Sequence, residues 1–462
     1  MSGSPILTAA QMRAAEQAVF RSGVPEYELM ERAGTAAAEI IWRAGAKRDL
    51  LVLCGPGNNG GDGFVIARLL RARGVPVRVA ALGESRTDSS RRARAAWNAP
   101  VERLAQAAPA TQVVDALFGT GLSRGLDAIA ADRLGALTQQ AALTYAIDLP
   151  SGVDSDTGAL LSAVPRFGVC IALGALKPAH LLDPAAGRFD RLVCAGIGIE
   201  ASDVIHRLSS PELGRPAASA HKYSRGLVAI VGGAMAGASR LAAHAAARSG
   251  AGMVRHLVGN AGSAGPDAIV TLAAQAPEDV VETLRDPRLA AVLVGPGLGR
   301  DRAARATLQA VMGCGHPLVL DADALILIAE DGIAVPAGAI LTPHDGEFVR
   351  LFGDGPGSKI DRALEAARLS GAVIIHKGAD SVIAAPDGRA AVAGGASPWL
   401  STAGTGDVLA GLAAGRLAVT GDPFQAACEA VWLHGEAARR SGAAFIADDL
   451  IVQMPAAIAS RL

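Results

Sequence analysis

A glycine-rich segment in the N-terminal half brings together residues that could bind an anionic ligand. The apolar run LLVLC, residues 50–54, is followed by GPGNNGGDGF and then by the helical pattern VIARLLRARG. Glycines between a strand and a helix let backbone N–H groups approach a phosphate at the positive end of the helix. Asn58, Asn59 and Asp62 add polar side chains at the same place. This favours a functional loop over a tight turn that needs only positive φ values.

The same segment satisfies the dinucleotide fingerprint G-x-G-x-x-G through Gly55, Gly57 and Gly60. The acidic residue that this fingerprint expects about 20 positions later could only be Glu84, which falls just past its strand. An ordinary Rossmann dinucleotide site therefore stays an open alternative.

Two further apolar runs carry carboxylates at or near their ends. VVDALFGTGLSRG places Asp115 inside a strand before a glycine-rich turn, and AIDLPSGVD ends a strand with Asp148 and Ser151. Carboxylates at the carboxyl ends of parallel strands lie where open α/β sheets bind ligands. Each aspartate alone could equally cap a helix, but three such strand ends in one domain indicate a shared crevice. Their oxygen donors suit a hard cation better than zinc or copper.

The segment STAGTGDVLAGLAAG, residues 401–415, carries the strongest signal of the C-terminal half. Its small residues predict a helix whose free N–H groups point together, with Asp407 in the first turn. Such a helix start can hold a transferring phosphoryl group while the carboxylate deprotonates an attacking hydroxyl. The alternative is an acidic residue favoured only by the helix dipole.

Short runs of Val, Leu and Ile alternate with longer helical segments through both halves. The runs begin at residues 50, 75, 112 and 143 and again at 226, 290, 317 and 372. Such near-continuous apolar strands predict parallel sheets covered on both faces. The stretch SSPELGRPAASAHKYSR from Ser209 lacks apolar periodicity, which is typical of a linker. We therefore predict two three-layer α/β/α domains, residues 1–213 and 218–462, the first of them Rossmann-like.

Composition limits the class of protein. The 462 residues include 43 basic and 44 acidic ones, and the net charge of −1 supplies no electrostatic footprint for nucleic acid or an anionic membrane. Mean hydropathy is high at +0.31, but the apolar runs are shorter than the roughly 20 residues of a membrane-spanning helix. The first residues lack a secretory pattern and hold a helix start at Thr8 and Gln11. Five scattered cysteines predict buried thiols rather than a zinc site or disulfides, and we expect a cytoplasmic protein.

The N-terminal motifs carry a family resemblance. ELMERAG from Glu28, GPGNNGGDGF, VDALFGTGL and DLPSGVD together resemble the NAD(P)HX epimerase domain, whose members interconvert the two C6 epimers of hydrated nicotinamide cofactors. The resemblance implies a potassium site at Asn59, Asp115 and Ser151. Lys177, in ALGALKPAH, is a further candidate for phosphate contact, although its residue type favours a solvated surface position. The residues implied to bind the hydrated dinucleotide are Asn58, Asn59, Gly60, Gly61, Asp62, Gly119, Thr120, Gly121, Leu122, Ser123, Arg124, Gly125 and Asp148.

A second resemblance covers the C-terminal half. GGAMAGASRLAAHAAARSGAG, GPGLG, DADAL, LTPHDGEF and HKGAD, with the helix start at Asp407, resemble the ADP- or ATP-dependent NAD(P)HX dehydratases of the ribokinase-like superfamily. That family usually reads T-P-H-P-G-E, and here Asp345 replaces the second proline. The resemblance implies that Asp407 is catalytic and acts on the C6 hydroxyl. It also implies that the hydrated cofactor contacts Ala238, Gly299, His344 and Asp407, and that ADP contacts Lys377, Gly378, Ala379, Asp380, Ser381 and Gly406.

The two resemblances together imply a bifunctional repair enzyme. The first domain would interconvert (R)- and (S)-NAD(P)HX, and the second would phosphorylate the C6 hydroxyl of the S form at the expense of ADP and eliminate the phosphate to give NAD(P)H. The implied cofactors are K⁺ in the first domain and Mg²⁺ in the second. The expected partners are NADHX, NADPHX and ADP, without nucleic acid or membrane, and we expect a homo-oligomer. The alternative is a ribokinase-like vitamin or sugar kinase fused to a nucleotide-binding domain, which leaves LTPHDGEF and the N-terminal motifs unexplained.

Overall fold

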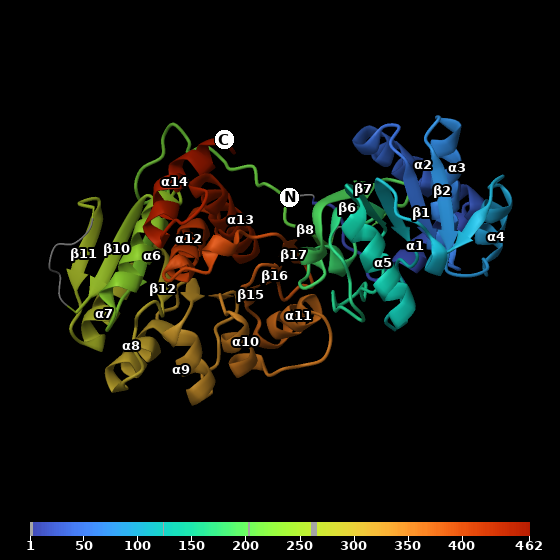
Figure 1. The fold of residues 1–462 in the computed structure, drawn as a ribbon. Coiled ribbons are helices and arrows are strands. Elements are labelled where there is room, and N and C mark those ends of the chain that lie inside the picture. The colour runs from blue at the N-terminus through green and yellow to red at the C-terminus, as the bar shows by residue number, and fades with distance from the viewer. Residues whose placement is uncertain (1–2, 123, 202–203, 260–265) are drawn as a thin grey trace. The chain divides into compact units, whose positions relative to one another are not determined.

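The computed structural model of the chain describes residues 3–122, 124–201, 204–259 and 266–462. Within that part the chain divides into two units, residues 4–205 and, together with Gly3, residues 206–462. Each unit is built around its own sheet (Figure 1).

A seven-stranded parallel sheet forms the centre of residues 4–205. Its order is β3-β2-β1-β4-β5-β6-β7, and all neighbouring strands run parallel. The strands are β1 (Leu50–Cys54), β2 (Val77–Ala81), β3 (Val101–Arg103), β4 (Gln112–Ala116), β5 (Leu143–Ile147), β6 (Phe167–Leu173) and β7 (Phe189–Ala195). The apolar runs at 50, 75, 112 and 143 are β1, β2, β4 and β5, as predicted.

Helices cover both faces of this sheet, because alternate residues of a strand point in opposite directions. Leu50, Val52 and Cys54 of β1 pack with residues of α2, α3 and α4, whereas Leu51 and Leu53 pack with α5. The predicted three-layer arrangement is confirmed for this unit. Its helices are α1 (Ala9–Arg21), α2 (Glu26–Gly45), α3 (Asn58–Ala72), α4 (Asp88–Ala95) and α5 (Ala128–Gln140), with short 3₁₀ turns at Leu104–Gln106, Pro178–His180 and Ala186–Arg188.

The strand order reverses at β1, which lies between β2 and β4. Cys54 at the end of β1 is in register with Ala116 at the end of β4. The segments that follow these two strands therefore begin side by side. Such a switch point, at the carboxyl edge of an open α/β sheet, is where ligands bind.

Helix α3 begins at Asn58, so the prediction of a loop before a helix from Val65 was wrong. The glycines allow the early start, because a Cβ on Gly60 would lie 1.9 Å from the Gly55 oxygen and one on Gly63 would lie 2.8 Å from Ala116 Cβ. Asn58, Asn59 and Asp62 thus occupy the first turns of the helix.

A ten-stranded sheet forms the centre of the second unit, in the order β11-β10-β9-β12-β13-β14-β15-β16-β17-β8. Neighbours from β11 to β15 run parallel, whereas β15, β16 and β17 pair antiparallel. The runs at 226, 290, 317 and 372 are β9, β12, β13 and β15, as predicted, but the antiparallel extension lies outside the prediction. The strands are β8 (Ile205–Arg207), β9 (Leu227–Val231), β10 (Met253–Val258), β11 (Ile269–Ala273), β12 (Leu289–Val294), β13 (Leu318–Leu320), β14 (Ile340–Leu341), β15 (Val373–His376), β16 (Ser381–Ala384) and β17 (Ala390–Ala393).

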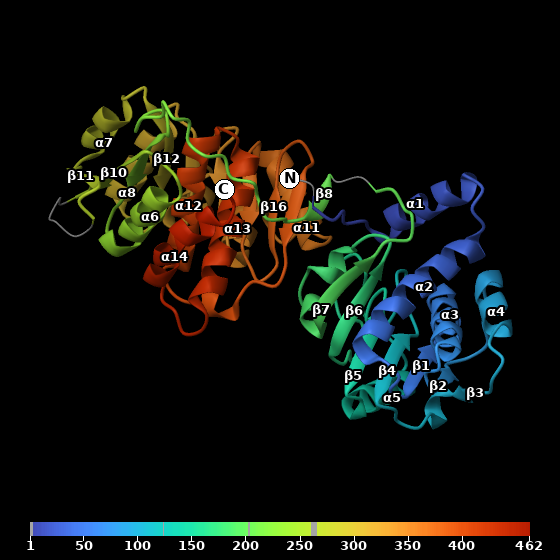
Figure 2. The same cartoon turned by 90° about the horizontal axis from the view of Figure 1, so that it is seen from above.

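Helix α12 packs closely on α6, and α14 lies beside both (Figures 1 and 2). Small residues allow this approach, since a Cβ on Gly411 would lie 2.2 Å from the Ala242 oxygen. The tight contact fixes the start of α12, which carries Asp407. The helices of this unit are α6 (Ala236–Arg248), α7 (Pro277–Leu284), α8 (Arg302–Met312), α9 (Asp323–Asp331), α10 (Asp345–Phe352), α11 (Lys359–Ser370), α12 (Thr405–Thr420), α13 (Pro423–Ser441) and α14 (Ala447–Ala459), with a 3₁₀ turn at Pro398–Leu400.

Two smaller predictions concern the linker and the cysteines. Residues 208–226 contain no helix or strand, in agreement with the predicted linker. Three thiols, Cys54, Cys170 and Cys428, are buried, whereas Cys194 is exposed and Cys314 half-buried. The prediction of buried thiols was thus wrong for Cys194, which lies on β7 at the edge of its sheet, and for Cys314. Among the described residues no helix is both long and apolar enough to cross a membrane.

Candidate active sites

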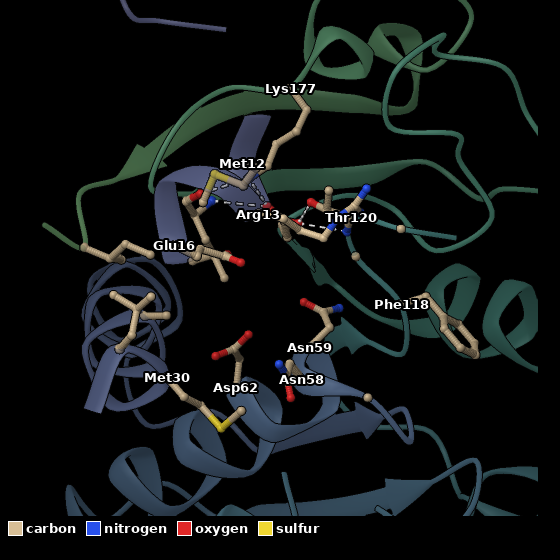
Figure 3. A pocket seen from close by; sticks show the side chains of 18 of the residues that line it. Met12, Arg13, Glu16, Met30, Asn58, Asn59, Asp62, Phe118, Thr120 and Lys177 are labelled. Carbon is tan, nitrogen blue, oxygen red and sulfur yellow. Dashed lines mark hydrogen bonds and ion pairs between the residues drawn. The ribbon is translucent and has the colours of Figure 1, made fainter. Parts of the chain in front are cut away.

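A cavity of about 560 Å³ lies at the switch point of the first sheet (Figure 3). The start of α3, the segments after β4 and β5, and helices α1 and α2 supply its walls. The arrangement brings together residues from separate motifs, as predicted for a shared crevice. The predicted residues that line it are Asn58, Asn59, Asp62, Gly119, Thr120, Gly121, Leu122, Arg124 and Asp148.

The remaining predicted contacts of the hydrated dinucleotide are Ser123, Gly60, Gly61 and Gly125. Ser123 falls outside the described residues. Gly60, Gly61 and Gly125 are not among the described residues that line the cavity. Gly61 and Gly125 allow close packing, because a Cβ on Gly61 would lie 2.5 Å from Met30 Cε and one on Gly125 would lie 2.2 Å from the Leu161 oxygen.

Asp148 is fixed in the cavity wall as an anion. Its Oδ1 accepts a hydrogen bond from Lys177 Nζ at 2.5 Å, and its Oδ2 accepts one from the Thr120 backbone N–H at 3.0 Å and another from the Thr120 hydroxyl. Burial favours the neutral form, but the charge and hydrogen bond of Lys177 outweigh it and lower the pKa of Asp148 to about 2. Asp148 is therefore ionised at neutral pH and can accept hydrogen bonds from a ligand.

Lys177 is a buried residue, so the preference for a solvated surface lysine was wrong. Its side chain is 1% exposed, and Nζ also donates to the Leu173 oxygen at 2.8 Å. A lysine can occupy such a position when a carboxylate and a carbonyl satisfy its ammonium group. Because Lys177 lines the cavity, it can also contact an anionic ligand.

Asp115 and Ser151 form a second polar cluster beneath the cavity. The Ser151 hydroxyl donates to Asp115 Oδ1 at 2.7 Å and its backbone N–H to Oδ2 at 2.9 Å, and Leu117 N–H donates to Oδ1 at 3.1 Å. Asp115 is fully buried, and burial raises the pKa of its carboxyl to about 6. Among the described residues no basic side chain pairs with it.

These oxygens fit the chemistry of a hard cation. An ion would neutralise the buried Asp115 carboxylate, and oxygen ligands suit hard cations. Asn59 lies nearby against Gly119, where a Cβ would be 3.1 Å from Asn59 Oδ1, and its buried Nδ2 has no hydrogen-bond partner among the described residues. Those residues contain no cluster of three or more His, Cys, Asp or Glu side chains that could hold a metal ion.

In the second unit Asp407 lies in the first turn of α12, as predicted. Burial raises its pKa to about 6, the charge of Asp321 adds to this, and Lys377 opposes it. Gly404 precedes the helix with φ of 89°, a conformation that glycine adopts without strain. The carboxyl is thus placed beside free helix N–H groups, with a pKa that allows it to take up a proton near neutral pH.

Lys377 lies close to the carboxylates of Asp321 and Glu347. Its Nζ donates to Asp321 Oδ1 at 2.9 Å and lies 3.9 Å from Glu347 Oε2. A Cβ on Gly406 would lie 3.6 Å from the same nitrogen. Burial opposes the charged form, but Asp321 and Glu347 outweigh it and raise the pKa of Lys377. The Lys377 ammonium group therefore stays charged at neutral pH, and it lies near the start of α12.

The rest of the predicted nucleotide segment forms the turn between β15 and β16. Gly378 N–H donates to the Ser381 hydroxyl oxygen at 3.1 Å, and Ala379 accepts a hydrogen bond from the Ala396 N–H. Asp380 forms a buried ion pair with Lys359 at 2.5 Å. The Asp380 carboxylate thus stabilises the turn from within.

Three predicted contacts of the hydrated cofactor lie at other strand ends. Gly299 has φ of 86° and donates its N–H to Asp323 Oδ2 at 3.0 Å. Ala238 lies in the first turn of α6 and His344 is the N-cap of α10. The His344 side chain is 62% exposed, so it is accessible to a ligand.

Asp345 starts α10 without disturbing it. Proline is favoured at the first helical position, and an acidic residue is stabilised there by the helix dipole. His344 and Glu347 still form a capping box, and Asp345 Oδ1 pairs with His376 Nε2 at 3.2 Å. The capping box of α10 is thus formed with aspartate in place of the usual proline.

Comparisons with known proteins match both halves of the chain. Residues 26–179 match the family model described as YjeF-related protein N-terminus, and residues 228–456 match the model for NAD(P)H-hydrate dehydratase. The bifunctional NAD(P)H-hydrate repair enzyme Nnr of Salinibacter ruber is 36% identical over 540 residues, which cover 99% of this chain and 96% of that protein. The chain belongs to the family of bifunctional NAD(P)H-hydrate repair enzymes.

Two further similarities agree with this membership. The repair enzyme of the same name from Escherichia coli is 34% identical over 448 residues, covering 90% of this chain and 85% of that protein. A ribokinase-like superfamily protein of known structure from Enterococcus faecalis is 22% identical with a TM-score of 0.50, covering 57% of this chain and 98% of that chain. The latter shows the ribokinase-like fold. Since both domain models of the repair-enzyme family match in one chain, the alternative of a vitamin or sugar kinase is not needed.

Asp321 and Glu347 of this repair-enzyme chain were not predicted as site residues, although both lie in the motifs DADAL and LTPHDGEF. Asp321 directly follows β13, which is the signal that identified Asp148. Glu347 stands three residues after His344, the spacing of a capping box. Both residues approach Lys377 because they follow separate strands that end at the same edge of the sheet.

Proposed function

We propose that residues 1–213 interconvert (R)- and (S)-NAD(P)HX and that residues 218–462 dehydrate (S)-NAD(P)HX to NAD(P)H at the expense of ADP. Membership of the repair-enzyme family over nearly the whole chain is the observation that carries this proposal. The cavity at the switch point and the Asp407 helix start offer one site for each reaction.

In the dehydratase domain Asp407 would act as the general base. It would take the proton of the C6 hydroxyl while that oxygen attacks the terminal phosphorus of ADP, and AMP would leave. Loss of a proton from C5 and of phosphate from C6 would then form the C5–C6 double bond of NAD(P)H. The N–H groups at the start of α12 and the Lys377 ammonium would stabilise the transferring phosphoryl group. His344, Ala238 and Gly299 would contact the hydrated cofactor, and residues 377–381 with Gly406 would contact ADP.

Mg²⁺ would neutralise charge on the nucleotide phosphates during this transfer. The donor set fits such a role, since Mg²⁺ usually takes one or two protein carboxylates and completes its shell with phosphates and water. Asp321 and Glu347, which share Lys377, could supply those oxygens.

In the epimerase domain the first turns of α3 and the segment after β4 would bind the hydrated dinucleotide, with Asp148 accepting hydrogen bonds from it. K⁺ would be held by Asp115, Ser151 and Asn59 and would supply a fixed positive charge beneath the cavity. A cytoplasmic location, a homo-oligomeric state and the absence of nucleic-acid and membrane partners remain predictions from the sequence.

The direct test of the dehydratase uses purified full-length chain, (S)-NADHX, ADP and Mg²⁺. Absorbance of the reduced nicotinamide should return in step with consumption of ADP. If no NADH forms although ADP and Mg²⁺ are present, the proposed function is wrong.

We expect dehydration of (S)-NADHX to weaken below about pH 6. Burial and the neighbouring Asp321 raise the pKa of Asp407 to about 6, and a general base acts only when it is ionised. Below that pKa kcat should therefore fall by about tenfold per pH unit. The measurement is kcat at saturating (S)-NADHX and ADP across the acid range. A kcat that stays constant from about pH 7 to about pH 5 would exclude Asp407 as the base.

A further inference from the structure

Glu16 of α1 lines the epimerase cavity, although none of the sequence motifs includes it. Its side chain points into the space that Asp62 faces from α3 (Figure 3). Glu16 is half-buried and Asp62 is 8% exposed. Among the described residues no hydrogen bond or ion pair engages either carboxyl group. Two carboxyl groups that none of the described residues engages therefore face the same cavity.

Helix α1 holds Glu16 in a defined position. A capping box between Thr8 and Gln11 fixes its start, and the Ala9 N–H donates to Asp156 Oδ1 at 2.7 Å. Met12 is 3% exposed and packs with Leu7. Glu16 lies one helical turn beyond Met12 and hence on the same face. The helix is thus anchored with its acidic residue toward the cavity.

The two carboxyl groups differ in burial and therefore in how readily each loses its proton. Burial, followed by the charges of Asp148 and Glu16, raises the pKa of Asp62 well above its usual range, with Lys177 opposing. Burial and then Asp148 also raise the pKa of Glu16, with Glu26 adding to this and Lys177 and Arg13 opposing. The more exposed Glu16 gives up its proton more readily than the deeply buried Asp62.

We propose that Glu16 is a catalytic base of the epimerase and works with Asp62 as the acid. The proposal rests on the epimerase function proposed above for this domain. Reversal of configuration at C6 requires one of its bonds to break and to form again from the other face. C6 is bonded to both the hydroxyl oxygen and the ring nitrogen, so the ring can open to an aldehyde.

Proton transfer balances in that step. The Glu16 carboxylate takes the proton of the C6 hydroxyl, the oxygen electron pair forms the C6=O bond, and the C6–N bond breaks with its electron pair on nitrogen. The Asp62 carboxyl gives its proton to that nitrogen. Rotation of the aldehyde presents its other face, and the nitrogen attacks C6 while the two protons return. No oxidant or further reactant is consumed.

The test compares Glu16→Gln with the wild type in the full-length chain, and it uses (R)-NADHX as substrate. We expect Glu16→Gln to lower kcat of epimerisation by about 10²-fold or more, with KM changed much less, because the amide cannot accept the proton. Dehydration of (S)-NADHX by the same preparation should be unchanged, and hydrogen exchange in strands β4 to β6 at the wild-type rate should show that the epimerase unit is folded. Glu16→Asp should recover part of kcat and the acid limb of its pH profile.

Glu39→Gln is the matched control, because Glu39 lies on the surface of α2 and pairs with Arg43 and Arg73. It should epimerise like the wild type. A Glu16→Gln variant with wild-type kcat would overturn the role of Glu16 while leaving the epimerase function intact. If the wild type itself fails to consume (R)-NADHX, the proposed epimerase function fails instead.

Discussion

Replacement of Asp407 by asparagine should lower kcat for dehydration of (S)-NADHX by about 10²–10⁴-fold, the usual contribution of a general base. The amide keeps the shape of the side chain but cannot take the C6 hydroxyl proton. Binding of ADP should change little, because the N–H groups at the start of α12 and the Lys377 ammonium remain. The measurement is NADH formation in single turnover, together with ADP affinity from titration calorimetry.

Asp387→Asn provides a matched control for this change. Asp387 lies in the exposed turn between β16 and β17 and pairs with Arg389. Its replacement should leave dehydration at the wild-type rate. Full dehydration by Asp407→Asn would show that no carboxylate is needed at this position and would exclude the proposed mechanism. Epimerisation of (R)-NADHX by Asp407→Asn should be unaffected in either case.

The second large effect concerns Lys177. Replacement by methionine leaves the Asp148 carboxylate buried without its counter-ion, and breaking such a pair typically costs about 3–5 kcal/mol. We expect residues 4–205 to lose stability by that order and epimerisation to be lost. Hydrogen exchange in strands β4 to β6 measures the stability of this unit separately from the second one.

Two variants sharpen the result. Arg166→Met removes a surface pair with Asp190, whose partners are 63% and 58% exposed, and should cost less than about 1 kcal/mol. Lys177→Met combined with Asp148→Asn should be less destabilised than Lys177→Met alone, because no buried charge is left unpaired. Equal hydrogen-exchange rates in Lys177→Met and Arg166→Met would contradict a stabilising role for the buried pair of Lys177 and Asp148.

The Lys177 contribution also depends on pH. The pKa of Asp148 is lowered to about 2 from an ordinary value of 3.8. Because this pKa is lower in the folded chain than in the unfolded chain, the Asp148 carboxylate stabilises the fold at pH values above the unfolded pKa. This stabilisation is lost as the pH falls from about 4 toward 2. The difference in free energy of unfolding between the wild type and the variant that combines Lys177→Met with Asp148→Asn should therefore shrink in that pH range.

Features that depend on local sequence could be predicted well. The strands β1, β4 and β5 were recognisable as continuous apolar runs, and the carboxylates Asp115 and Asp148 as residues at or near their ends. Asp407 was recognisable because small residues open its helix. In each case neighbouring residues in the chain supply the decisive pattern.

Features that depend on distant segments could not be predicted. Lys177 looks like a surface residue until Asp148 and Leu173, from other elements, surround its ammonium group. The start of α3 was misplaced because glycine usually weakens a helix, whereas Gly60 and Gly63 are needed here for contact with the sheet. Glu16 gave no signal, because only the packing of α1 against the cavity places it beside Asp62.

The central claim is that one chain carries both repair reactions. The most direct measurement incubates the full-length chain with pure (R)-NADHX, ADP and Mg²⁺ and follows the recovery of NADH. We predict complete recovery by the wild type, and conversion of R into a mixture of epimers without NADH by Asp407→Asn. Persistence of (R)-NADHX with the wild type, under conditions in which (S)-NADHX is dehydrated, would contradict the claim.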